Sequence, residues 1–195
     1  MNSTPTAQLQ SGQAAVIDAP ETEPVVTPVP AAELADTAPA LVDLFVANVN
    51  AGASLGYVAP LARGDALRYW LSLRGDLHSG ARLLLVARVD GRIVGSGQLL
   101  MPQWPAALHR AELQKLFVTP DLKGRGIGRR LVAELHAAAR RQQRSLLILN
   151  TRSGEPPVAF YKKLGYREAG VIPGYIRTGT DVRHASMMLY QELPA

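Results

Sequence analysis

A glycine-rich turn near the middle of the chain constrains the fold more than any other feature. The segment "VTPDLKGRGIGRRL" (118–131) carries three glycines within five positions. An apolar run, "HRAELQKLFV" (109–118), precedes it, and apolar residues at helical spacing follow it. This order predicts a strand that turns tightly into a helix. The apolar run "SLLILN" (145–150) then predicts a second strand, parallel to the first through a right-handed crossover.

The remaining hydrophobic pattern predicts a mixed α/β domain around this central unit. Asp90-Gly91 between two β-rich runs is a strong signal for a hairpin turn. Pro and Gly positions mark the ends of the other elements. In chain order we expect a strand at "PVVTPV", a helix from Thr37 and Pro39 to about Asn50–Gly52, a helix from Asp65 as N-cap to Gly75, a short helix from Ser153 and Pro156 to Gly165 as C-cap, and two final strands near 166–172 and 183–192.

Length and composition favour one soluble domain. The 195 residues suit a single core, and residues 1–23, rich in Ser, Thr, Pro, Gln and Ala, predict a flexible tail before a domain at 24–195. The absence of cysteine excludes disulfides, thiolate metal sites and a covalent cysteine intermediate. The histidines have no metal-ligand spacing, so we expect no metal. No apolar run is long enough for a bilayer, and the start lacks the pattern of a secretory signal, so we expect a cytoplasmic protein.

Charge is distributed unevenly along the chain. No Lys or Arg precedes Arg63, whereas six acidic residues do. All 21 basic residues, Arg63 included, and the remaining ten acids lie from residue 63 onward. A basic field of this kind attracts polyanions. A nucleic acid, a phosphorylated cofactor and a merely basic surface all fit the composition.

The glycine turn differs from the two best-known nucleotide-binding patterns. No glycine is followed by the Lys-Ser/Thr pair of a Walker A loop, and the sixth position of the Rossmann pattern is Arg129 or Leu131 instead of Gly. The spacing instead reads Lys123-Gly124-Arg125-Gly126-Ile127-Gly128. Glycines let backbone N–H groups close around an anion, and the helix that follows directs its own N–H groups there. A tight turn with solvated arginines is the alternative interpretation.

Two motifs in order resemble the GNAT superfamily of N-acetyltransferases. The glycine turn follows the family's acetyl-CoA segment, with Lys123 at the usual Gln/Arg position, and "AFYKKLGY" (159–166) is similar to its second marker. The stretches "GASLGY", "RAELQKL" and "PGYIRT" further resemble the tabtoxin-resistance branch of the family. The resemblance implies a mixed, largely antiparallel central sheet with a parallel strand–helix–strand cofactor unit and flanking helices.

The resemblance also implies an activity, the direct transfer of an acetyl group from acetyl-CoA to a primary amine. The expected acceptor is a small metabolite or amino-acid-like compound, with a toxin or antibiotic among the options. The implied cofactor-binding residues are Leu116, Phe117 and Val118 for the pantetheine arm, and Lys123, Gly124, Arg125, Gly126, Ile127, Gly128 and Arg129 for the pyrophosphate.

The implied catalytic residues are Glu112 for the amine and Tyr161 for the departing thiolate, with Asn150 where the tabtoxin-resistance pattern has an aspartate. An amide cannot act as a base at neutral pH, so Asn150 would orient water or the amine, or indicate another substrate.

Other functions remain open from the sequence. Without catalysis the chain would be an acetyl-CoA sensor, and protein N-termini or lysines are alternative acceptors. "GASLG" (52–56) matches a hydrolase nucleophile elbow, but an expected helix, not a strand, precedes it. The arginines between 129 and 144 suggest nucleic-acid binding, yet they lack interleaved aromatic residues. We therefore expect a small-molecule amine partner, with no nucleic acid and no membrane, and a monomer or homodimer.

Overall fold

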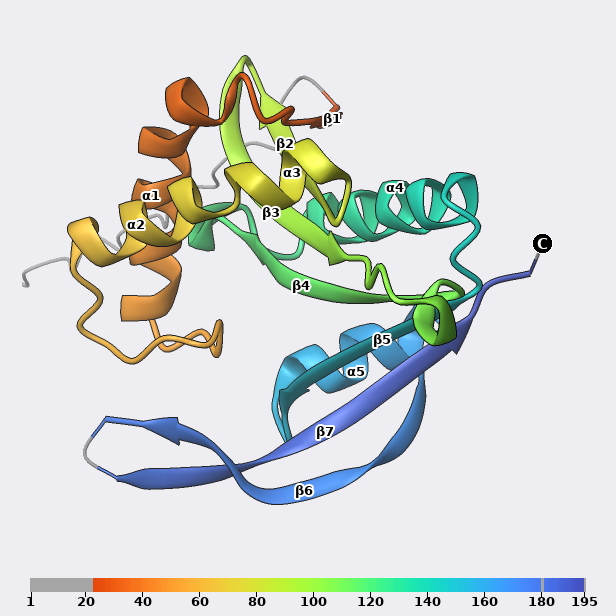
Figure 1. The fold of residues 1–195 in the computed structure, drawn as a ribbon. Coiled ribbons are helices and arrows are strands. Elements are labelled where there is room, and N and C mark those ends of the chain that lie inside the picture. The colour runs from red at the N-terminus through yellow and green to blue at the C-terminus, as the bar shows by residue number, and fades with distance from the viewer. Residues whose placement is uncertain (1–22, 180, 195) are drawn as a thin grey trace, which may run out of the picture.

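A computed structural model describes residues 23–179 and 181–194, so nearly all of the predicted tail at 1–23 lies outside the described residues. Seven strands form one sheet in the order β1-β2-β3-β4-β5-β7-β6 (Figure 1). Neighbouring strands are antiparallel, except that β4 and β5 are parallel. The predicted fold class is confirmed. The strands are β1 (Val25–Pro28), β2 (Arg82–Val89), β3 (Arg92–Leu100), β4 (Arg110–Val118), β5 (Leu146–Arg152), β6 (Arg167–Thr178) and β7 (Val182–Glu192).

Helices cover both faces of the sheet and enclose two hydrophobic clusters. The helices are α1 (Leu34–Asn50), α2 (Arg63–Ser72), α3 (Arg74–Ser79), α4 (Ile127–Arg141) and α5 (Pro156–Lys163). On one face, α1 and α2 pack their apolar side chains against alternate residues of β2 and against Phe117 of β4. On the other face, α4 covers the intervening β2 residues together with Leu113 and Val118 of β4, and α5 packs against β5. The period-two alternation of the strands thus supplies both cores.

The glycine turn and the hairpin form where the sequence predicts them. Asp90 and Gly91 both have positive φ, 49° and 76°, which is the conformation of a two-residue hairpin turn between β2 and β3. Gly126, at φ 82°, is the N-cap of α4. The helix therefore begins directly at the glycine turn, between the parallel strands β4 and β5.

Several predicted boundaries are wrong. Helix α1 begins at Leu34 instead of Thr37, because Leu34 extends its buried face and Pro39 is accommodated inside the helix. Asp65 is not an N-cap: α2 begins at Arg63, and Asp65 in its first turn pairs with Arg68. The predicted end at Gly75 falls within α3, a separate short helix.

The C-terminal elements also differ in detail from the prediction. Glu155, not Ser153, precedes α5 as its N-cap, and Leu164 is the C-cap, with Gly165 at φ 93° one residue later. Strand β6 continues to Thr178, beyond the predicted end at 172, because β7 keeps pairing with it after a break in register. In Figure 1 these two strands extend away from the rest of the sheet as a long hairpin.

Strand β4 carries a bulge that changes the face to which its side chains point. Its register against β3 breaks between Ser96 and Gln98, and Lys115 adopts φ 48°. Leu113 lies on the α4 side of the sheet, so simple alternation would place Phe117 there too. The extra residue shifts the alternation, and Phe117 packs with α1 and α2 instead.

No helix in the described part of the chain is long and apolar enough to cross a bilayer.

Candidate active site

A cavity of about 1030 Å³ lies where β4 and β5 separate. The two strands pair only from Arg110–Glu112 on β4 and Leu146–Ile148 on β5, although both continue further. Beyond Glu112, the β5-facing edge of β4 has no ladder partner among the described residues. The glycine turn, α5 and the loop after α1 complete the cavity walls. The open edge leaves backbone N–H and C=O groups of β4 available to a bound molecule.

The glycine turn forms one wall of this cavity and is shaped for an anion. Gly124 and Gly126 have φ of 83° and 82°, which only glycine adopts without strain. No atom lies within 4 Å of the position that a Cβ would take at either residue, so both face open space. Lys123 and Arg129 add positive charge beside the first N–H groups of α4. The donor set fits a pyrophosphate.

Most of the predicted cofactor-binding residues line the cavity, and one does not. Leu116, Phe117 and Val118 lie on its β4 wall, and Lys123, Gly124, Gly126, Ile127, Gly128 and Arg129 lie at the turn. Arg125 is not among the residues that line it. The Ile127 side chain is 2% exposed and belongs to the core under α4, so any contact with a ligand would be through its backbone.

The three predicted catalytic residues also line this cavity, each from a different element. Glu112 comes from β4 at the last parallel pair, Asn150 from β5, and Tyr161 from α5. Asn150 is exposed, and its Oδ1 accepts a hydrogen bond from the Ser186 hydroxyl on β7 at 3.5 Å. The structure thus gathers carboxylate, amide and phenol groups at the point where the strands diverge.

Tyr161 is a protonated phenol in this environment. Its side chain is buried, and its ring packs edge-on against Phe160 and Tyr166, with centroid distances of 5.2 and 5.4 Å. Burial raises the pKa of Tyr161 well above its ordinary value because the anionic form is poorly solvated. The hydroxyl therefore keeps its proton at neutral pH and can donate it.

Sequence reasoning missed Lys115, which lines the cavity beside Glu112. Its ammonium lies 5.2 Å from the ring centroid of Tyr69 and 6.0 Å from that of Tyr57. Burial, with the charge of Arg82 as a second cause, lowers the pKa of Lys115. The loop 51–56, which follows α1, and Tyr175 of β6 also line the cavity. A β-bulge at a lysine has no clear sequence signal, so only the three-dimensional arrangement identifies this residue.

The hydrolase alternative does not fit the structure. Ser54 lies in the loop between α1 and α2, so a helix precedes it, and the strand–turn–helix geometry of a nucleophile elbow is absent at this position. The imidazole of His184 instead contacts the Thr178 hydroxyl at 2.8 Å within the β6–β7 hairpin.

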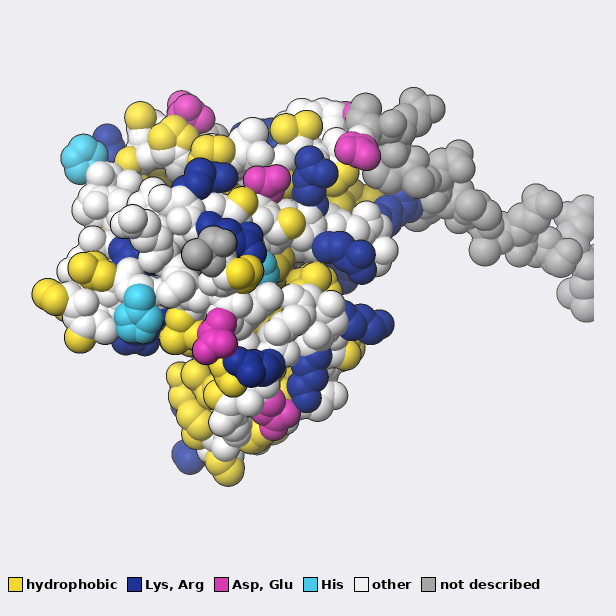
Figure 2. Space-filling view, turned by 90° about the vertical axis from the view of Figure 1, so that its right-hand side faces the viewer, with side chains coloured by type: hydrophobic (Ala, Val, Ile, Leu, Met, Phe, Trp, Pro, Cys, Tyr) yellow, Lys and Arg dark blue, Asp and Glu magenta, His cyan; other side chains and the backbone are white. Residues whose placement is uncertain are grey.

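One of the arginines considered for nucleic-acid binding is part of the protein interior. Arg144 is buried, and its guanidinium donates to the carbonyls of Leu108 and Pro102. On the face shown in Figure 2, Lys and Arg side chains are interspersed with acidic and hydrophobic ones and form no continuous band. Of these arginines, Arg144 is therefore held inside the fold and is not available to a nucleic-acid backbone.

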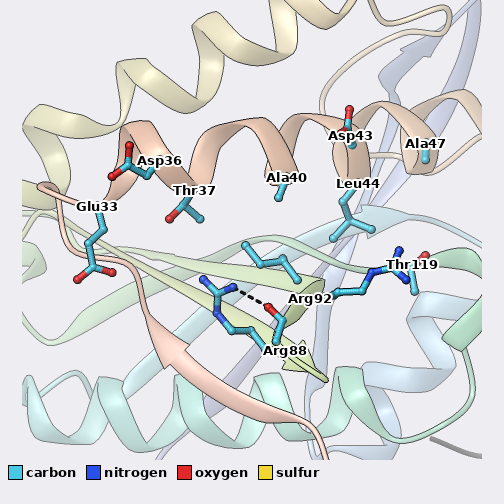
Figure 3. A pocket seen from close by; sticks show the side chains of 12 residues that line it. Glu33, Asp36, Thr37, Ala40, Asp43, Leu44, Ala47, Arg88, Arg92 and Thr119 are labelled. Carbon is cyan, nitrogen blue, oxygen red and sulfur yellow. Dashed lines mark hydrogen bonds between the residues drawn. The ribbon is translucent and has the colours of Figure 1, made fainter.

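A second cavity, of about 710 Å³, lies between α1 and the β2–β3 hairpin, and no predicted site residue lines it. Figure 3 shows Glu33, the N-cap of α1, and Asp36 of α1 on one side of it and Arg88 and Arg92 on the other. The Arg88 guanidinium donates to the Gly91 carbonyl at 3.1 Å. Both acidic and basic side chains line this second cavity, and the cavity shares no lining residue with the one at β4 and β5.

Several solved acetyltransferases share this arrangement of strands and helices. A ribosomal-protein-alanine N-acetyltransferase from Brucella melitensis superposes with a TM-score of 0.71 at 22% identity, over 87% of this chain and 99% of that chain. A GNAT superfamily phosphinothricin acetyltransferase from Sinorhizobium meliloti, in complex with AcCoA, gives 0.69 at 17% identity, over 87% and 88%. At these identities the likeness establishes the fold.

Sequence comparison also finds similarity to acetyltransferases in the central segment of the chain. Residues 80–168 match the family model of the acetyltransferase (GNAT) domain. An uncharacterized N-acetyltransferase from Azospirillum brasilense, from a hisH-hisA intergenic region, is 40% identical over 106 residues, which are 53% of this chain. The match spans 61% of the length of that relative. The segment from β2 to the start of β6 is thus GNAT-like in both sequence and fold.

Proposed function

We propose that this protein is an acetyl-CoA-dependent N-acetyltransferase that acts on a primary amine. The observation that carries the proposal is the cavity at the separating strands, which connects an anion cradle to Glu112, Asn150 and Tyr161. The GNAT match over residues 80–168 and the shared fold support it. We further propose a small metabolite or amino-acid-like acceptor and a cytoplasmic location.

The residues divide into a cofactor side and an acceptor side. Backbone N–H groups of residues 124–129 would hold the pyrophosphate, and the unpaired edge of Leu116–Val118 would pair with the pantetheine arm. When bound, acetyl-CoA supplies an acetyl group activated as a thioester. A β4 backbone N–H directed at the thioester carbonyl would stabilise the charge that develops on its oxygen.

The catalytic side chains carry out two proton transfers. Glu112 accepts a proton from the incoming ammonium, directly or through water, so that the amine can attack. Tyr161 donates its retained phenolic proton to the departing sulfur. Asn150 orients the amine or a water molecule, because its amide cannot serve as a base.

Thermal unfolding with and without acetyl-CoA tests the proposal. Specific binding to the folded protein raises the melting temperature by mass action. We expect a shift for the wild type that Gly126→Glu abolishes, since the new carboxylate enters the cradle. Gly80→Glu is the matched control: Gly80 also has positive φ and open space around its Cβ position, but it does not line the cavity. Its shift should equal that of the wild type.

The outcome decides whether acceptors are worth screening. An absent shift in folded wild-type protein would contradict the proposal. A shift without acetylation of any amine in a screen would instead favour the acetyl-CoA sensor. Peptides with free N-termini and lysine side chains belong in that screen, because a ribosomal-protein-alanine N-acetyltransferase shares the fold.

A further inference from the structure

Lys115 occupies an unusual backbone position that directs its side chain into the cavity. It is the only non-glycine residue of the described strands with positive φ, at 48°, and it forms the β4 bulge. Gln114 bonds to Arg82 on the side of the sheet that α1 and α2 cover. Without the bulge, the next side chain would point to the opposite side. The bulge keeps Lys115 on the same side, where it reaches Tyr57 and Tyr69.

The ammonium of Lys115 has aromatic neighbours but no anionic contact. Among the described residues, none forms a hydrogen bond or an ion pair with its Nζ. The nearby amide oxygen of Gln114 accepts from Arg82 instead, at 2.9 Å. Arg82 repels Lys115, and the electrostatic attraction of Glu112 opposes that effect only in part. A partly buried cation without such a partner is costly, and an anion supplied by a ligand would relieve that cost.

The position of Lys115 in the cavity indicates that an anion bound to it belongs to the acceptor and not to the phosphates of the cofactor. The glycine turn and the N-terminus of α4 already provide a phosphate cradle at another wall. Lys115 lies three residues along β4 from Glu112, beside Gly56 of the loop after α1. A Cβ at Gly56 would stand 3.2 Å from Nζ, so this glycine leaves the space that the ammonium occupies.

We propose that Lys115 binds the carboxylate of the acceptor, so that the enzyme acetylates amino acids or close analogues whose amine lies toward Glu112. The inference rests on the proposed acetyltransferase function. An amino acid presents an ammonium and a carboxylate a few bonds apart, and Glu112 and Lys115 present the opposite charges in one cavity. Tyr57 and Tyr69 hold the Lys115 ammonium in place by cation–π contact while it binds.

Paired acceptors test this assignment. Each member of a panel of α-amino acids is compared with its own carboxamide, which keeps the amine and removes the negative charge. We expect the wild type to acetylate the best acids with a kcat/KM at least about 10-fold above that of their amides, as one charge-assisted hydrogen bond provides. In Lys115→Met that preference should disappear through a higher KM for the acids. Lys115→Arg, which keeps the charge, should restore part of it.

A second variant separates a local contact from general electrostatics. Lys162→Met removes an exposed cation of α5 that pairs with Glu168 and does not line the cavity. It should retain the full preference for acids. The acetyl-CoA melting shift, measured on every variant, shows that Lys115→Met is folded and binds cofactor.

Three results would overturn the inference while leaving cofactor binding intact. They are equal rates for acids and amides in the wild type, no acetylation of any acid, and a preference for acids that survives Lys115→Met. Loss of the acetyl-CoA shift in the wild type would remove the proposed function itself, which is a distinguishable outcome.

Discussion

Burial keeps the Tyr161 side chain in one protonation state, the neutral phenol. Because the pKa of its phenol lies well above the ordinary value of 10.0, the hydroxyl is protonated through the whole range in which an amine can be acetylated. We therefore predict that Tyr161→Phe lowers kcat about 10²-fold, the usual contribution of one positioned acid, with KM for acetyl-CoA unchanged. Steady-state kinetics of thiol release with the best amine from the screen would measure both constants.

Tyr166→Phe is the matched control for that experiment. Tyr166 is also buried and packs against Tyr161, but it does not line the cavity. Its hydroxyl contacts His136 at 3.0 Å, so its loss should reduce stability and leave kcat near the wild-type value. Equal kcat values for Tyr161→Phe and wild type would remove Tyr161 from the proton transfer.

At the level of residues, the sequence could predict the site only where a local pattern carried it. The positive φ of Gly124 and Gly126 follows from glycine spacing, and Tyr161 follows from a motif on a short helix. Lys115 is different, since a left-handed lysine results from the register of β4 against β3, which the whole sheet determines. The mutual approach of Glu112 and Asn150 to one cavity depends on how far two strands diverge, and no local pattern encodes that.

Among the elements, α4 contains a histidine whose burial makes stability depend on pH. His136 contacts the Tyr166 hydroxyl, and burial, followed by the charge of Arg140, lowers its pKa from 6.5 to about 4. In the unfolded chain it gains a proton near pH 6.5, whereas in the folded protein it stays neutral until about pH 4. The free energy of unfolding should therefore fall as pH decreases from 6.5 to 4, by at most about 1.4 kcal/mol per pH unit. Partial solvent exposure of the ring reduces this value.

Denaturant unfolding across that pH range, in wild type and His136→Gln, tests the assignment. Glutamine has a side chain that can hydrogen-bond but does not titrate in this range, so the variant should lose this part of the pH slope. Tyr166→Phe should retain it, because burial and not the hydrogen bond is the main cause of the lowered pKa. Identical slopes in wild type and His136→Gln would assign the acid sensitivity to other groups.

The elements themselves were largely predictable, and their ends were not. Strands β2 to β5 and helix α4 follow directly from apolar period and turn residues. The start of α1 at Leu34 depends on the burial of this residue, which outweighs the usual preference for Pro near a helix start. Helix α3 has no buried residue, so no apolar period marks it as separate from α2. Strand β6 extends to Thr178 because β7 continues beside it. The sequence of β6 alone contains no pattern that predicts this pairing.

For the molecule as a whole, the sheet has a weak seam at the cavity. Among the described residues, strands β1–β4 and strands β5–β7 are joined within the sheet only by the short parallel pairing of Arg110–Glu112 with Leu146–Ile148. The hydrophobic cluster in which α4 packs against the first set and α5 against β5 supplies the other connection. A ligand bound between β4 and β5 would span this seam, so it should stabilise the two halves as one cooperative unit.

Amide hydrogen exchange with and without saturating acetyl-CoA measures that coupling. We predict slower exchange at residues 113–118 and 123–129 and in β5. At a ligand concentration of 100 Kd, a stabilisation of about 2.7 kcal/mol corresponds to about 100-fold slower exchange for amides that open only by global unfolding. The tip of the β6–β7 hairpin, 177–178 and 182–183, does not line the cavity and should not change, because it opens locally. Gly126→Glu should show none of this protection, and protection confined to the hairpin would contradict binding at the seam.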